Sequence, residues 1–146
     1  MPNRELTTST RYVQLRAPVA ISGTQYGEYV DLQGWDAVDI VFNHAAGGGS
    51  PGTITPVIME HDDGALTANA SYDVVADADL AGELPVLTDA SDAGCFAVGY
   101  RGNSRYITIR TAQVTSTMAA LGVVAVLRKF SRQPSDTATV TTGTVT

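Results

Sequence analysis

The chain lacks several features that would point to particular classes of protein. Its 146 residues contain one cysteine, Cys95, so no intrachain disulfide can form. That argues against a small secreted scaffold held together by disulfides. The first eleven residues, MPNRELTTSTR, have no apolar core of the kind that a signal peptide needs. No apolar run approaches the ~20 residues of a membrane-spanning helix. We therefore expect a soluble protein made in a reducing cytosol, without a membrane partner.

Positive charge is missing from the middle of the chain. No Lys or Arg occurs from residue 17 to residue 100, a stretch that carries 13 acidic residues. Residues 101 to 132 carry six basic residues and no acid, and the first sixteen carry three arginines and one glutamate. Two interpretations stay open: these segments neutralise one another within one fold, or basic ends meet the acidic middles of neighbouring subunits. The net charge of -6 disfavours nucleic acid as a partner.

A sustained helical period is also absent, whereas the period of two that marks β-strands recurs along the chain. In the clearest case Val38, Ile40 and Phe42 alternate with other residues, which places these three side chains on one buried face of a strand. Gly34 interrupts the run before them and predicts a tight turn or corner. Trp35, the single tryptophan, is expected to seal one end of the core there.

The same alternation predicts about eight short strands, with turns rich in Gly, Pro and Asn between them. This pattern favours an all-β fold, an antiparallel two-sheet β-sandwich of jelly-roll type. Pro18 has no amide to donate, so it belongs at a sheet edge or a bend. Cys95 is expected to be a small buried apolar residue. Besides the strand at 37–42 and the one at 28–32 that meets it at the corner, the strands are expected at residues 12–21, 53–61, 71–75, 95–100, 105–111 and 118–127.

Two further expectations concern faces and loops. In the strand at 105–111, Ile107 and Ile109 are expected on one face and Tyr106, Thr108 and Arg110 on the other, with only one of the two faces buried. Residues 76–94 are acidic and rich in turn formers, and they predict a long loop with one helical turn near residues 77–81.

Three parts of the chain differ in composition. Residues 1–10 are polar and cannot bury enough surface to order alone, so they predict an extended N-terminal arm. Residues 11–130 contain the predicted strands and form the β-sandwich domain. Residues 131–146 are rich in threonine but offer no second apolar face, which predicts a tail or a strand added to a neighbouring molecule.

Residues capable of catalysis or metal binding occur, but not in recognised arrangements. His44 and His61 could approach each other in a hairpin, yet no third metal ligand stands at a characteristic spacing. Residues 62–64, Asp-Asp-Gly, are typical of a turn and lack the bidentate glutamate that ends a calcium loop. The glycines of residues 47–52 match GxGxxG, but β-type sequence follows where a helix is required. We therefore predict no enzyme, no cofactor and no bound metal.

Three segments share their pattern with one known group of proteins. They are residues 30–36 (VDLQGWD), residues 60–64 (EHDDG) and residues 98–106 (VGYRGNSRY). Together they resemble a family of small head proteins of tailed bacteriophages. The resemblance covers residues 12 to 130 and rests on turn and core features rather than on chemistry.

The resemblance implies a decoration, or cement, protein on the outer surface of the capsid. Its partners would be the major capsid protein and other copies of itself, as a dimer or trimer. It would be located on the virion after synthesis in the host bacterial cytoplasm. The family has no catalytic residues, so the resemblance assigns none to this chain. We expect contacts with capsid or neighbouring subunits from the N-terminal arginines Arg4, Arg11 and Arg16 and from the tail that begins at Arg132.

Two other functions stay open. A head-tail connector or minor tail protein would also be rich in β-structure, but it would form a small ring rather than a shell. A carbohydrate-binding β-sandwich module would usually display several aromatic side chains on one face for sugar stacking. Here Trp35 is single and the tyrosines are scattered along the chain, so this function ranks third.

Overall fold

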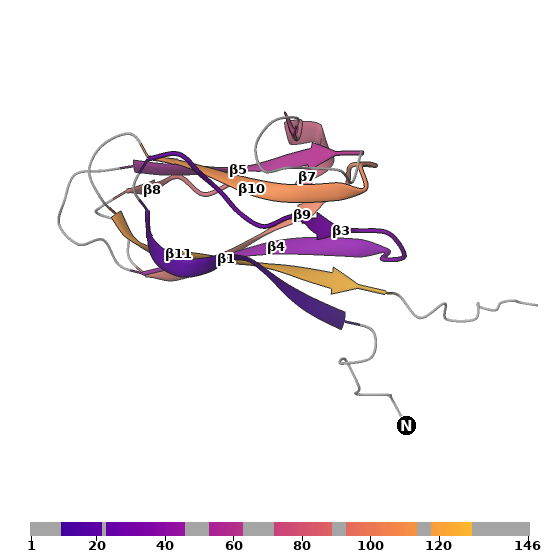
Figure 1. The fold of residues 1–146 in the computed structure, drawn as a ribbon, viewed down its shortest axis with the longest axis horizontal. Coiled ribbons are helices and arrows are strands. Elements are labelled where there is room, and N and C mark those ends of the chain that lie inside the picture. The colour runs from indigo at the N-terminus through magenta and orange to yellow at the C-terminus, as the bar shows by residue number, and fades with distance from the viewer. Residues whose placement is uncertain are drawn as a thin grey trace, which may run out of the picture.

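A computed structural model describes residues 10–21, 23–45, 53–62, 72–88, 93–113 and 118–129. They form an all-β, sandwich-like body of two antiparallel sheets (Figure 1). The first sheet has the order β1-β11-β4-β9-β7; the second has the order β2-β10-β5-β6, with β3 paired to β10 and β8 to β5. The strands are β1 Thr10–Ile21, β2 Gln25–Tyr26, β3 Val30–Asp31, β4 Ala37–His44, β5 Thr53–His61, β6 Asp73–Val74, β7 Leu80–Ala81, β8 Leu87–Thr88, β9 Gly94–Tyr100, β10 Tyr106–Gln113 and β11 Met118–Arg128.

The core lies between the two sheets. In Figure 1, β5 and β10 lie in one layer and β1, β4 and β11 in the other. Val38, Ile40 and Phe42 point inward from β4 and are at most 4% exposed, which confirms the predicted alternation. Ile107 and Ile109 of β10 are fully buried in the same cluster. Each such side chain contributes roughly 1.5–3 kcal/mol of burial free energy.

The predicted corner is confirmed, and it carries the chain from one sheet to the other. Strand β3 pairs with β10 of the second sheet, and β4 pairs with β11 and β9 of the first. Gly34, between them, has φ +82°, a conformation that glycine adopts without strain. The Trp35 amide donates to the Leu32 carbonyl (3.0 Å) and closes the turn. The Trp35 side chain is half-buried and packs against the core.

Strand β10 departs from the prediction, because both of its faces are buried. Tyr106 is 8% and Thr108 2% exposed, although they alternate with the inward isoleucines. The segment from β2 to β3 bulges over this strand. The Thr108 hydroxyl shares its hydrogen between the carbonyl oxygens of Gly27 (3.0 Å) and Glu28 (2.9 Å). The Tyr29 ring packs edge-on against Tyr106, with 5.9 Å between centroids.

Two other expectations were wrong or incomplete. Cys95 is exposed rather than buried, because it shares a register position with exposed Asn43 on the outer side of the first sheet. The predicted loop at 76–94 does contain one helical turn, the 3-10 helix η1 (Asp77–Asp79), but it also supplies β7 and β8. In the described ranges no helix is long and apolar enough to cross a membrane.

Several sequence-based predictions lie outside the described residues. They include Arg4 and most of the arm, the glycines of residues 47–52, Asp63 and Gly64 of the predicted turn, Arg132, and the tail at 131–146.

Candidate interaction site at the corner

The three segments that carry the phage-head resemblance meet at one end of the molecule, beside the corner. Arg105 binds Asp31 through two hydrogen bonds, Nε to Oδ1 at 3.0 Å and Nη2 to Oδ2 at 2.8 Å. The Leu32 amide donates to the Arg105 carbonyl at 2.8 Å. Tyr100 donates its hydroxyl hydrogen to the Glu60 carboxylate. Residues separated by up to 74 positions in the sequence are thereby fixed in one place.

Tyr100 joins the two sheets at this end through a side-chain hydrogen bond. It extends from β9 of the first sheet and reaches Glu60 on β5 of the second, and it is 8% exposed. Its hydroxyl also accepts a hydrogen bond from the Ser104 amide at 3.0 Å. Burial and the Glu60 hydrogen bond raise the pKa of Tyr100 to about 12. The phenol is therefore neutral at ordinary pH and can donate its hydrogen to the Glu60 carboxylate.

Gly102 allows the Tyr100 ring to fold back over the loop. A Cβ at residue 102 would lie 2.4 Å from the Tyr100 hydroxyl oxygen and 2.5 Å from the carbon that bears it. Real Cβ atoms do not approach other atoms this closely, so a larger residue here must displace the ring. The sequence VGYRGNSRY is thus a structural unit in which the glycine makes room for the tyrosine.

The Asp31–Arg105 pair has a modest energetic role. Its side chains are 40% and 44% exposed, so water screens the attraction. The Arg105 hydrogen bonds hold the pKa of Asp31 below its ordinary value. Arg105 also stacks above the Tyr106 ring, 5.0 Å from its centroid. Exposed pairs of this kind contribute up to about 1 kcal/mol, so the pair orients the loop more than it stabilises the fold.

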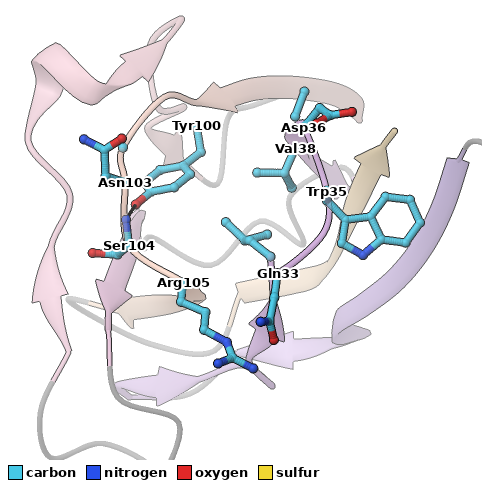
Figure 2. A pocket seen from close by; sticks show the side chains of 11 residues that line it. Gln33, Trp35, Asp36, Val38, Tyr100, Asn103, Ser104 and Arg105 are labelled. Carbon is cyan, nitrogen blue, oxygen red and sulfur yellow. Dashed lines mark hydrogen bonds between the residues drawn. The ribbon is translucent and has the colours of Figure 1, made fainter. Parts of the chain in front are cut away.

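A pocket of about 360 Å³ lies between the corner and the Tyr100 loop. In Figure 2 the labelled side chains surround this space, with Tyr100 and Trp35 on opposite sides and Gln33 and Arg105 along another edge. Its walls combine apolar surface with amide, hydroxyl and charged groups, which suits a small polar group with an apolar face. The lining residues are Leu32, Gln33, Trp35, Asp36, Ala37, Val38, Tyr100, Gly102, Asn103, Ser104 and Arg105.

The two histidines do not meet, contrary to the hairpin expectation. His44 ends β4 and is 1% exposed, with neither ring nitrogen hydrogen-bonded. Strand β5 starts at Thr53 and runs eight residues, roughly 26 Å, to the opposite end of the molecule at His61. His61 packs edge-on against Tyr72, with 5.8 Å between centroids. Among residues with described positions, no group of three His, Cys, Asp or Glu side chains is arranged to hold a metal.

The predicted contact arginines have different surroundings. Arg11 is exposed on β1, where a partner can reach it. Arg16 was expected to contact a partner, but it is a residue of β1 that is only 9% exposed. Sequence reasoning also missed the Tyr100–Glu60 bond. The sequence carries no signal for it, because 40 positions separate the two residues.

Comparisons with family models, with curated proteins and with solved structures find no match for this chain. The resemblance of residues 30–36, 60–64 and 98–106 to phage head proteins therefore stays a prediction. The interpretation of the molecule rests on its geometry and surface chemistry.

Proposed function

We propose that this protein is a structural, non-enzymatic component of a tailed-phage virion. It would bind the outer surface of the capsid and stabilise it by bridging neighbouring capsid subunits. The proposal includes the finer fold description, a jelly-roll-like sandwich with an N-terminal arm and a Thr-rich tail. The observation that supports it is the outer face of the first sheet, an apolar surface in the middle of a soluble domain.

The strand register identifies the residues of this outer face. Inward Val123, Ala125 and Leu127 of β11 are fully buried, so the valines between them point outward. One cross-strand row runs through β1, β11, β4 and β9 without a charged side chain. We call the outer face the uncharged residues Tyr12, Gln14, Val41, Ala97, Val124 and Val126 on this side of the sheet, where Asp39 is in register with Val126.

The chemistry of the outer face suits a protein surface. Tyr12 is 65% exposed, and Val41, Val124 and Val126 remain partly accessible. Grouped exposed apolar residues on a soluble domain mark interaction sites. The Asp39–Arg128 ion pair (2.9 Å) borders the valines and supplies the polar rim typical of protein interfaces. The major capsid protein is the occupant that the phage-head resemblance favours.

Cementing needs no chemistry beyond binding. A protein that binds only the assembled capsid stabilises that state by mass action. Contacts from several segments of one copy to different capsid subunits would raise the overall affinity without new core. The exposed Arg11 and the segments outside the described residues are the candidates for such additional contacts.

The proposal is tested by charging the outer face. Val41→Glu places a carboxylate among its valines, whereas Val57→Glu places one on the other sheet, at a position in register with Arg110. Both valines are half-buried strand residues, so the variants are matched. We expect Val41→Glu to weaken binding to undecorated heads at least about tenfold, or 1.4 kcal/mol, while Val57→Glu binds normally. Equal binding by both variants would remove the outer face from the proposal.

The corner pocket favours carbohydrate binding as a second candidate. It combines the Trp35 indole with the amide groups of Gln33 and Asn103, the kind of surface that sugars stack on and hydrogen-bond to. Binding on a glycan array that Asn103→Ala abolishes would support this function. If no glycan on the array binds, carbohydrate binding is refuted and the pocket has only a structural role.

A further inference from the structure

A β-bulge in β1 turns Arg16 toward the interior of the molecule. Gln14 pairs with Val124 and Arg16 pairs with Val123, so Leu15 and Arg16 together oppose one residue of β11. A bulge of this kind changes the direction in which the following side chain points. Leu15 is 1% and Arg16 9% exposed, although adjacent residues of a regular strand point to opposite faces.

Arg16 is buried, and no acidic side chain of the described residues forms an ion pair with it. Its guanidinium donates to the side-chain oxygen of neutral Gln25 on β2, and its Nε has no hydrogen-bond partner. Both ion pairs of the described ranges use other arginines, Arg105 and Arg128. Burial lowers the pKa of Arg16. Buried polar and charged groups are normally paired or hydrogen-bonded, so the unpartnered Nε marks a place where an anionic group would be stabilised.

The Arg16 groove lies between β1 and β2 and leads from the surface to this guanidinium. It has a volume of about 300 Å³. The hydrogen bond from the Glu28 amide to the Leu15 carbonyl (2.7 Å) joins its two sides. Glu28 lines the groove but is exposed and makes no ion pair with Arg16 in the described structure. The groove residues are Gln14, Leu15, Arg16, Ala17, Val19, Gln25, Tyr26, Gly27 and Glu28.

The opposite edge of the molecule carries the complementary charge. Strands β1 and β2 are end strands of their sheets, and β7 and β6 are the end strands on the other side. Asp73, Asp77 and Glu83 are exposed along that second edge. Each edge also displays two exposed apolar residues. Tyr12 and Val19 are 65% and 51% exposed on the groove side, and Val74 and Val86 are 51% and 62% exposed on the acidic side.

We propose that copies of this chain associate edge to edge, with a carboxylate of residues 73–83 of one copy entering the Arg16 groove of the next. The carboxylate would supply the anion that Arg16 lacks, in the paired geometry that guanidinium and carboxylate favour. The contact joins two different surfaces, so it is heterologous and generates a ring or a chain of copies. It rests on the homo-oligomer within the proposed function and assigns the interface to particular residues.

Matched substitutions on β1 test the contact in the isolated protein. Arg16→Gln removes the buried charge, and Arg11→Gln removes an exposed one from the same strand but outside the groove. Sedimentation equilibrium over a concentration series should show wild-type self-association that weakens with salt. We expect Arg16→Gln to raise the dissociation constant at least about tenfold and Arg11→Gln to change it less than about threefold. Thermal melts identify any variant that fails to fold.

Mixing two defective variants, both shown by thermal melts to fold, tests the head-to-tail geometry. The second variant carries Asp73→Asn, Asp77→Asn and Glu83→Gln, which removes the acidic edge and leaves Arg16 intact. Each variant should be monomeric alone, and an equimolar mixture should form dimers that grow no further. A monomeric wild-type protein, an Arg16→Gln variant that associates normally, or a mixture that stays monomeric would each overturn the proposal. These measurements use no capsids, so their failure would leave the Val41→Glu test of the proposed function unaffected.

Discussion

The replacement Gly102→Ala tests how the Tyr100 loop is built. The three nearest atoms to an added Cβ all belong to the Tyr100 side chain, at 2.4, 2.5 and 2.6 Å. The methyl group must therefore either strain this site or expel the ring. Overpacking costs about 1–3 kcal/mol, and losing a hydrogen bond to a charged group costs about 1.5–3 kcal/mol. Because expelling the ring relieves the strain, the two costs do not add, and we expect a loss of about 2–3 kcal/mol.

Urea unfolding measures this loss, and a double substitution identifies its cause. With an m-value of about 2 kcal/mol/M, the midpoint of Gly102→Ala should fall by about 1–1.5 M. In a Tyr100→Leu background the ring is absent, so Gly102→Ala should cost much less than it does in the wild type. A wild-type midpoint for Gly102→Ala would refute the reasoning. An equal loss in both backgrounds would show that the ring is not the obstacle.

Three further predictions follow from the same structure. The pKa of Tyr100 is about 12 in the folded protein and ~10 in an unfolded chain, so the free energy of unfolding should fall as pH rises from about 10 to 12. Tyr100→Phe should flatten that alkaline decline in urea titrations. Gly27→Ala should cost at least about 2 kcal/mol in thermal melts, because its Cβ would lie 2.5 Å from the Leu15 carbonyl oxygen. Asp31→Asn should cost less than about 1 kcal/mol by the same measurement, since its pair with Arg105 is exposed.

The strand framework was predictable where one face of a strand is covered and the other is not. Val38, Ile40 and Phe42 show the period of two because the second sheet covers only their side. The prediction failed at Thr108, because a bulged segment about 80 residues earlier in the chain covers its face. It also failed at Cys95, where exposure depends on whether another layer covers the sheet. Strands of two residues, such as β7 and β8, are too short for any period to be visible.

The charge pattern was readable from the sequence, but its pairing was not. Two acids of the middle stretch, Asp31 and Asp39, pair with Arg105 and Arg128 of the basic stretch, which supports neutralisation within one fold. Arg16 has no such acid in the described structure, which supports the alternative that charges are also matched between subunits. In the proposed oligomer, charges are therefore matched both within one chain and between chains, because each arginine meets a different environment once the strands are assembled.

The most direct test of the proposed function is the copy number of this protein in purified virions. Quantitative mass spectrometry would measure it relative to the major capsid protein. A decoration protein that covers the shell predicts a number comparable to that of the capsid protein. A handful of copies per particle would contradict the proposal and favour a connector or tail role, and absence from virions would contradict any structural role in the particle.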